Sequence, residues 1–297
     1  MVSKHAIKAT PARLIFVVFN YFFCIAIGIL CLIPVIHMMA VSFSSKVAVT
    51  SGHVFLWPVS FTLENYKLLV LDPQFFRSYG VTILRSAVGW LVSLFLTVLS
   101  AYPLSQKTVN FPARKYIVWI YMGAMFFGGG MIPTYLVVDA MGLIDNFWAL
   151  ILPCAINTYN IILMTNFIKS LPDSLQESAF IDGANHFTTL FRIVLPLCLP
   201  SLATISLFIV MMHWNAWFDG MIYIRSAARK PLQTYLRSFI ISNMDVDVSS
   251  IDDAERLISA DAANGAKIFI AMLPILCVYP FLQKYFVKGV VRGSVKE

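Results

Sequence analysis

The residues from about 14 to 39 form an apolar run that contains no Asp, Glu, Lys or Arg. A helix needs about 20 apolar residues to cross a bilayer, whereas the apolar region of a cleavable signal peptide has only about 7–15. The run therefore predicts a retained membrane-spanning helix. The whole chain has the same character, since 59% of its 297 residues are hydrophobic and only 12% are charged. Soluble domains carry about 25% charged residues, so the composition indicates an integral membrane protein.

Five further apolar segments predict additional spans. We expect an all-α fold with six transmembrane helices in a single transmembrane domain over residues 1–297. The spans are predicted at about 14–39, 84–104, 116–138, 147–168, 197–217 and 267–285. The last has the shortest apolar core, and Lys267 and Lys284 bracket it with side chains long enough to reach the two interfaces.

Basic residues on the short loops predict the orientation of these spans. They lie before the first span, between the second and third, and after the sixth: Lys4, Lys8, Arg13, Lys107, Arg114, Lys115, Lys284, Lys288, Arg292 and Lys296. Cytoplasmic loops carry an excess of Lys and Arg. We therefore expect both termini, and the loop 169–196, in the cytoplasm. Such flanking residues also explain the net charge of +7, so no nucleic-acid partner is expected.

The loop 169–196 is predicted to form two short helices around a glycine. Asp173 and Ser174 are suitable N-caps for the first helix, and Gln176 and Glu177 follow three residues later as in a capping box. Gly183 fits the position after the helix, where φ is usually positive.

The second short helix is expected to present one apolar stripe outside the bilayer. Its members have the spacing of one helix face: Phe187, Leu190, Phe191 and Val194. Such a stripe packs on a partner protein, on the chain's own bundle or on the lipid surface.

The same loop resembles the EAA signature of binding-protein-dependent ABC importer permeases. The matching residues are Glu177, Ser178, Ala179, Asp182, Gly183, Ala184, Ile193, Leu195 and Pro196. Nine residues, 184–192, lie between Gly183 and Ile193, as in the signature, and Ser178 replaces its second Ala. Other segments resemble the maltose-type carbohydrate permeases: 65–66, 101–105, 213–219, 279–286 and 288–290. The segment 127–135 is similar to a subgroup that imports oligosaccharides, including uronate-containing ones.

The resemblance implies a role and a set of partners. The loop would be a coupling helix that docks on a separate ATPase, with Glu177 as its charged anchor and Gly183 as its bend. No G-x-x-x-x-G-K-[ST] phosphate loop occurs in the sequence, so ATP and Mg²⁺ are expected on the ATPase and no cofactor on this chain. The family combines two permeases, often non-identical, with two ATPase subunits and an external solute-binding protein. The chain would be a multi-pass permease of the bacterial cytoplasmic (inner) membrane that imports oligosaccharides and is not itself an enzyme.

Polar residues inside the predicted spans are candidates for the translocation pathway. Asn157 and Asn160 lie midway along the fourth span, and Trp214 and Asn215 lie late in the fifth. Aromatic faces and amides suit sugar rings. The alternative is hydrogen bonding that only joins helices.

Gly128, Gly129, Gly130 and Pro133 stand inside the third predicted span. Each Gly costs about 1 kcal/mol of helix propensity and Pro costs more. We therefore expect a kinked or unwound helix, either as a hinge or cavity wall or as a site of close helix packing.

Other functions are less consistent with the residues. The histidines do not cluster and the five cysteines form no CxxC pair, so neither a catalytic nor a metal site is expected. An ABC permease for a non-sugar solute remains an alternative. A secondary transporter would need acidic residues at a span centre, and none occurs. The acids between 245 and 261 are expected on an outer loop that meets the binding protein.

Overall fold

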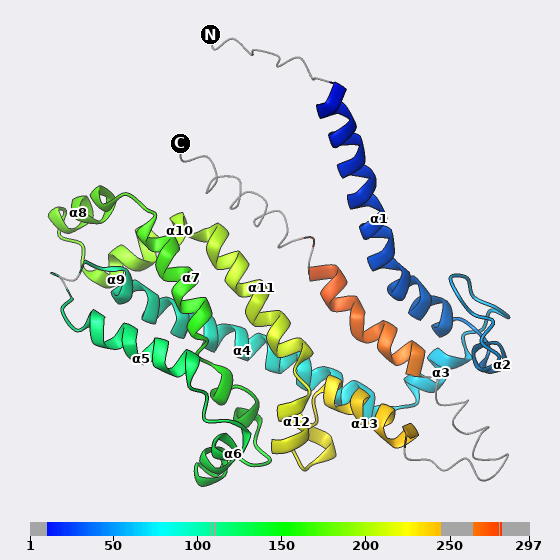
Figure 1. The fold of residues 1–297 in the computed structure, drawn as a ribbon. Coiled ribbons are helices and arrows are strands. Elements are labelled where there is room, and N and C mark those ends of the chain that lie inside the picture. The colour runs from blue at the N-terminus through cyan, green and yellow to red at the C-terminus, as the bar shows by residue number, and fades with distance from the viewer. Residues whose placement is uncertain (1–10, 108, 110, 245–263, 279, 281–297) are drawn as a thin grey trace. The chain divides into compact units, whose positions relative to one another are not determined.

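The fold is described from a computed structural model, which covers residues 11–107, 109, 111–244, 264–278 and 280. Every regular element in these ranges is a helix, so the all-α class is confirmed for them (Figure 1). The first six are α1 (Pro11–Ser42), α2 (Lys46–Thr50), α3 (Glu64–Val70), α4 (Pro73–Ser105), α5 (Arg114–Phe126) and α6 (Met131–Ala140).

The second half of the chain contains shorter elements. These are η1 (Phe147–Leu150), η2 (Leu152–Cys154), α7 (Thr158–Lys169), α8 (Asp173–Ile181), α9 (His186–Thr189), η3 (Leu190–Val194), α10 (Leu195–Leu197), α11 (Leu199–Asn215), α12 (Phe218–Tyr223), η4 (Ala227–Arg229) and α13 (Leu232–Met244). A further apolar helix covers Asn264–Val278.

Two helices, α1 and α4, are long and apolar enough to cross a membrane as single elements. Three further candidates are helix pairs that bend at a short break. The bends are 115° between α5 and α6, 51° between Phe147–Cys154 and α7, and 85° between His186–Leu197 and α11. The predicted sixth span, 267–285, continues beyond the described residues. By length and composition the described residues therefore contain two to five spans, and the number six stays a prediction.

The helix α4 begins well before the predicted span 84–104. Pro73 stands in its first turn, and Asp72 accepts a hydrogen bond from the backbone N–H of Phe75 at 3.1 Å. A cap and an N-terminal Pro start a helix independently of hydropathy. The apolar run therefore predicted only the part of α4 that is suited to the bilayer core.

The predicted fourth span, 147–168, is not one helix. It starts with the 3₁₀ turns η1 and η2, and α7 begins only at Thr158. Pro153 has no N–H to donate, which interrupts a regular helix. Asn157 has extended backbone angles, φ −116° and ψ 112°, and its side chain caps α7.

The chain groups into two compact units, which are described separately. One contains Met1–Leu71 and Asp245–Ile270, and the other contains Asp72–Met244 and Ala271–Glu297. In the first, Asn65 is fully buried and its Nδ2 donates to the carbonyls of Ser42 at 3.1 Å and Ser44 at 2.9 Å. Tyr66 adds a 2.8 Å hydrogen bond to Ser42 Oγ. These bonds fix the chain where it turns away from α1.

The second unit is built around α4, α7 and α11. Its largest buried cluster joins these helices to the segment before α11: Val98, Ala101, Tyr102, Leu104, Ile161, Met164, Ile168, Leu190, Val194, Cys198, Ile205 and Ile209. A second cluster joins α6, η1 and α12 through Val138, Ala149 and Tyr223. The segment before α11 is thus packed against the helical core, and α6, η1 and α12 pack together in a cluster of their own.

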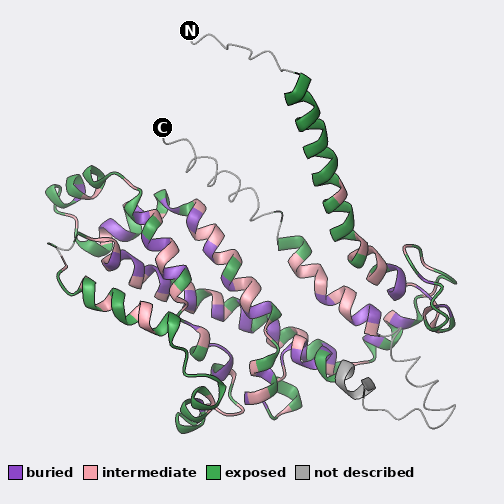
Figure 2. Cartoon of the chain, viewed as in Figure 1, coloured by how far each residue is buried: buried purple, intermediate pink, exposed green. Residues whose placement is uncertain are grey.

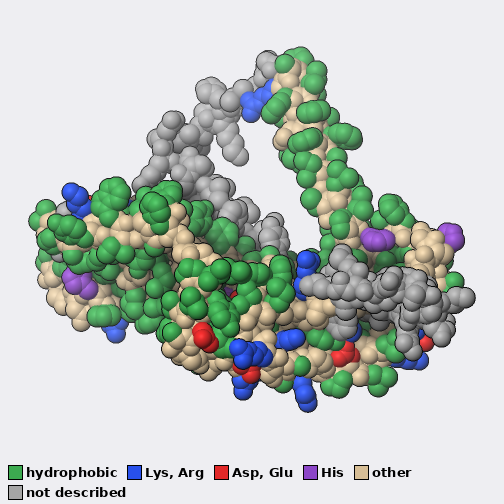
Figure 3. Space-filling view, turned by 60° about the horizontal axis from the view of Figure 1, so that its bottom comes forward, with side chains coloured by type: hydrophobic (Ala, Val, Ile, Leu, Met, Phe, Trp, Pro, Cys, Tyr) green, Lys and Arg blue, Asp and Glu red, His purple; other side chains and the backbone are tan. Residues whose placement is uncertain are grey.

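Other helices bury little within the chain. Residues along most of α1 are exposed and apolar, and α5 has no buried residue (Figure 2). Hydrophobic side chains cover most of the visible surface, and charged ones occupy only a few places (Figure 3). A helix that is apolar all round is suited to lipid or to a partner chain.

Candidate functional site

The sequence from α8 to α10 forms the predicted helix–glycine–helix segment, which we call the coupling segment (residues 173–197) after the role predicted for it. Gly183 has φ +84°, as predicted. The N–H of Ala184 donates to the carbonyl of Ala179 at 2.9 Å, and that of Gly183 donates to Phe180 at 3.1 Å. This pattern is a glycine C-cap, which satisfies the last carbonyls of α8. A left-handed conformation at residue 183 therefore defines the bend.

The predicted capping box at the start of α8 is wrong. The N-cap is Pro172, with no side-chain capping bond. The Asp173 carboxylate instead lies 2.9 Å from the ammonium group of Lys107, which follows α4. An ion pair to another segment thus replaces the local cap.

Glu177, the predicted anchor, is exposed and faces the same lysine. Lys107 Nζ lies 3.5 Å from Glu177 Oε1, and Gln106 donates to Gln176 at 3.1 Å. The hydrogen bond that Lys107 donates to Asp173, together with the charges of Asp173 and Glu177, raises the pKa of Lys107 above its usual value. Because these groups are largely exposed, the pair is weak and sensitive to salt. Glu177 thus remains accessible to a partner.

The remaining signature residues differ in burial. Ser178, Asp182 and Pro196 are exposed, Ala184, Ile193 and Leu195 are half-buried, and Ala179 is buried. Ile181, next to the bend, is 86% exposed. An exposed apolar side chain beside exposed charges is typical of a surface that meets another protein.

The predicted apolar stripe is divided between two faces. Leu190 and Val194 are buried in the core, but Phe187 is 67% and Phe191 48% exposed. Phe187 and Phe191 are four residues apart, as are Leu190 and Val194, so each pair lies along one edge of the stripe. The helix is a π-helix over Leu190–Val194. The stripe thus packs on the chain's own bundle with one half and leaves the other half uncovered.

A cavity of about 300 Å³ lies between the C-terminal end of α4 and α9. Tyr102, Gln106, His186 and Phe187 line it together with apolar neighbours. Tyr102 Oη and His186 Nδ1 are 3.3 Å apart across this junction. The coupling segment is therefore attached to α4 at several points.

The four residues predicted for the translocation pathway have different environments. Asn157 caps α7 by accepting from the N–H of Asn160 at 3.1 Å, and Asn160 is buried. Asn215 Nδ2 donates to the carbonyl of Met211 at 3.0 Å. Trp214 is buried and lines a largely apolar cavity of about 320 Å³ with Ser86 and Trp90. The lining of this cavity does not include the three asparagines, and the pathway role stays a prediction.

The glycines 128–130 interrupt the third predicted span, as expected. Helix α5 ends at Phe126, α6 begins at Met131, and the two meet at 115°. Gly130 has φ +82°, and Thr134 Oγ1 donates to its carbonyl at 2.7 Å. A Cβ atom on Gly129 would lie 3.7 Å from the Cβ of Pro133, whereas one on Gly128 or Gly130 would meet nothing within 4 Å. All are exposed in the isolated chain, and their role as a hinge or cavity wall stays a prediction.

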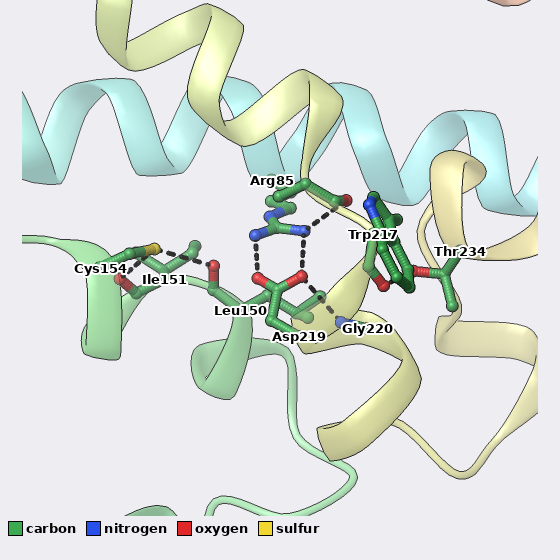
Figure 4. A network of polar contacts seen from close by, with 9 residues as sticks. Arg85, Leu150, Ile151, Cys154, Trp217, Asp219, Gly220 and Thr234 are labelled. Carbon is green, nitrogen blue, oxygen red and sulfur yellow. Dashed lines mark hydrogen bonds and ion pairs between the residues drawn. The ribbon is translucent and has the colours of Figure 1, made fainter. Parts of the chain in front are cut away.

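Sequence reasoning missed a buried ion pair between Arg85 of α4 and Asp219 of α12. Arg85 Nη1 donates to Asp219 Oδ1 at 3.2 Å and to the carbonyl of Ala216 at 3.3 Å, while Nη2 pairs with Oδ2 (Figure 4). The Arg85 side chain is only 1% exposed and that of Asp219 23%. The signal was present, because an Arg inside a predicted span indicates a functional position by default.

The surroundings of this pair hold Asp219 in place. Its Oδ1 accepts from the N–H of Gly220 at 2.8 Å, and Thr234 Oγ1 donates to the carbonyl of Trp217 at 2.7 Å. The 3₁₀ turns around Cys154 lie beside the pair (Figure 4). Three segments that are distant in sequence therefore meet at Arg85. The acidic outer loop, 245–261, lies outside the described residues.

The described residues combine apolar helices that are long enough to cross a membrane with an exposed helix–glycine–helix segment, as in an integral membrane protein that docks on a partner. No family model matches the chain. It is 41% identical to Protein LplC of Bacillus subtilis, over the full length of both chains. It is 40% identical to the polygalacturonan/rhamnogalacturonan transport system permease protein YtcP of the same organism, over 93% of this chain and 96% of that one.

Two solved structures are also similar to this chain. One is a bacterial ABC transporter involved in the import of the acidic polysaccharide alginate, matched with a TM-score of 0.83 and 34% identity over 93% of this chain and 98% of that one. Another, an alginate ABC transporter in complex with a periplasmic protein bound to an alginate pentasaccharide, matches at a TM-score of 0.56 and 17% identity, over 91% of this chain and 95% of that one. The chain belongs to the carbohydrate permeases of binding-protein-dependent ABC importers. This membership excludes the secondary transporter considered above.

Proposed function

We propose that this permease forms half of a transmembrane pathway that imports uronate-containing oligosaccharides. A second permease provides the other half, two ATPase subunits bind ATP and Mg²⁺, and an external binding protein delivers the sugar. The observation that carries the proposal is the coupling segment. It places the exposed anchor Glu177, the left-handed Gly183 and the uncovered rings of Phe187 and Phe191 on one segment.

The membrane arrangement is part of the proposal. The chain spans the bacterial cytoplasmic membrane six times with both termini inside, and the coupling segment faces the cytoplasm. The basic residues on the short loops support this orientation. A cytoplasmic coupling segment is within reach of an ATPase, which takes its ATP from that side.

The substrate class is supported by relatives rather than by a binding site on this chain. YtcP is named for polygalacturonan and rhamnogalacturonan, and the matched solved transporter imports alginate. All three names denote polymers that contain uronic acids. We therefore infer a short, acidic oligosaccharide as the cargo of this permease.

The test is a reconstituted complex of this chain with the second permease, the ATPases and the binding protein of its own host. We expect oligogalacturonides or alginate oligosaccharides, presented by the binding protein, to stimulate ATP hydrolysis and to enter proteoliposomes. Maltodextrins of equal length serve as neutral controls. Uptake of neutral sugars or of a non-sugar solute alone would contradict the proposed cargo. The single chain without partners is expected to hydrolyse no ATP.

A further inference from the structure

The long helix α4 is attached to the coupling segment at its inner end. Tyr102 meets His186 of α9, Gln106 meets Gln176 of α8, and Lys107 meets Asp173. These contacts involve different helices of the coupling segment. A displacement of that segment therefore reaches α4 directly.

The same helix is attached to α11 and α12 at its outer end. Arg85 binds the Asp219 carboxylate with both Nη groups, and Nη1 also binds the carbonyl of Ala216, directly after α11. One turn earlier on α4, Thr82 Oγ1 accepts from the N–H of Leu232 at 2.7 Å. The C-terminal end of α11 and the N-terminal ends of α12 and α13 are thus all bound to one end of α4.

Between these ends, α4 and α11 are in close contact. Gly89 lies against the ring of His213, and Val98 and Ala101 share a buried cluster with Ile205 and Ile209. Well-packed interiors deform little. Because α11 follows the coupling segment directly in the chain, the two helices receive the same displacement.

The chemistry of the outer contact makes it stiff. A guanidinium that binds both oxygens of a carboxylate fixes orientation as well as distance, which an ammonium group cannot do. At 1% exposure, Arg85 has almost no water with which to exchange its partner. Loss of Asp219 would leave a buried charge unpaired.

From these contacts we propose that the Arg85–Asp219 pair rigidly connects α12 to α4 and α11, and that α4 and α11 move together as one lever. We call this pair the outer joint. The joint makes α12 and the outer ends of both helices follow the coupling segment as one body. Arg85 and Asp219 are positioning residues, and they do not contact the cargo in this role. The inference rests on the proposed function, because it assigns a mechanical part within that importer.

The test measures cargo transported per ATP hydrolysed in the reconstituted complex. We expect Arg85→Gln, Asp219→Asn and Arg85→Lys to retain ATP hydrolysis stimulated by the binding protein but to lower this ratio about tenfold, a usual size for the coupling between two sites. The reversed pair, Arg85→Asp with Asp219→Arg, should recover part of it. Arg229→Gln is the matched control, since it removes an outer ion pair to Asp145 that involves neither α4 nor α11.

Two results would contradict the proposal that this pair is a rigid joint. In the first, the variants assemble and transport per ATP is unchanged, or transport and hydrolysis fall together. In the second, the apolar pair Arg85→Met with Asp219→Leu, which restores burial without the ion pair, couples as well as the wild type. Absence of wild-type uptake of any oligosaccharide would instead reject the proposed function.

A measurement without substitutions at the joint keeps the proposal testable if those variants fail to assemble. Spin labels at the exposed positions Arg77 and Met221 report on α4 and α12. In an otherwise wild-type complex, we expect the distance between the labels to be the same with and without bound ATP. A distance that changes between the two states would contradict a rigid joint.

Discussion

Gly89 of α4 lies so close to His213 of α11 that a Cβ atom on Gly89 would be 2.4 Å from the imidazole Nε2. His213 is fully buried, and neither ring nitrogen has a hydrogen-bond partner among the described residues. A side chain at position 89 would therefore force the buried ring, or α11 itself, to shift. The close fit between α4 and α11 therefore requires glycine at position 89, because glycine has no side chain.

We expect Gly89→Ala to lower the thermal stability of the complex, because overpacking of a core costs about 1–3 kcal/mol. Gly80→Ala is the matched control on the same helix, since nothing lies within 4 Å of its Cβ position. That change should be neutral or stabilising, because Ala favours a helix over Gly by about 0.5–1 kcal/mol. Melting in detergent compares the two variants. Equal melting temperatures would contradict the tight contact.

Gly183→Val should uncouple ATP hydrolysis from transport. Its φ of +84° is unfavourable for a β-branched residue, whereas nothing lies within 4 Å of its Cβ position. The effect is therefore backbone strain of about 1–2 kcal/mol rather than a clash, and Asn should be tolerated better than Val. The readout is ATPase stimulation by the loaded binding protein. Gly142→Val, at φ +67° outside the coupling segment, should leave stimulation intact.

Glu177→Lys should impair coupling more than Glu177→Ala, because the new charge would repel Lys107. Exchange of both charges, with Lys107→Glu, should restore the contact within the chain but not an anchor on the ATPase. Recovery of full activity by the exchanged pair would show that Glu177 acts only inside the permease. A photoreactive crosslinker at position 178 is expected to capture the ATPase chain, and crosslinks confined to the permease would contradict docking.

Asn157→Ala should destabilise the chain by about 1 kcal/mol, since it removes the N-cap of α7. Asn157→Asp keeps a capping oxygen and should retain stability. If Asn157 also lines the sugar pathway, the Asp variant will transport acidic oligosaccharides more slowly despite normal melting. Normal transport by a stable Asp variant would assign Asn157 to capping alone.

The contact between Asp145 and the loop after α12 should weaken in acid. Asp145 Oδ1 accepts from the N–H of Ser226 at 2.9 Å and of Arg225 at 3.1 Å. The Ser226 bond is the main cause that lowers the Asp145 pKa. A lowered folded-state pKa means that the stabilisation is full above the unfolded value of about 3.9 and disappears as the pH falls through the folded pKa.

Hydrogen exchange at Ser226, corrected for intrinsic rates, measures this loss. Protection should decline in the wild type as the pH is lowered below about 4. Asp145→Asn is the matched variant, because Asn also tolerates the positive φ of 58° at this position. Its protection should not depend on pH. A parallel decline in both proteins would assign the effect to another group.

Local sequence signals predicted the parts of this fold that depend on neighbouring residues. Gly183 and the glycines 128–130 act through their own backbone preferences, so a bend at each was predictable. Long apolar runs predicted α1 and the core of α4 because bilayer thickness determines their length.

The features that sequence reasoning missed depend on distant partners. Asp173 forms an ion pair with Lys107 rather than a cap, and Arg85 reaches a carboxylate 134 positions away. The π-helix at η3 has no residue signature of its own. It occurs where Leu190 and Val194 pack into the bundle, which depends on residues far away in the sequence.

The π-helix at Leu190–Val194 also sets the rotational phase between α9, which precedes it, and α10, which follows it. Each residue of an α-helix turns the chain by about 100°, and the π turn adds one residue to that count. Deletion of Arg192, which is exposed, would return the segment to α-helical phase. The part of the coupling segment before the deletion, with Glu177, would then be rotated relative to α10. One residue more or fewer in this short helix therefore changes the direction in which the exposed side chains of the coupling segment point.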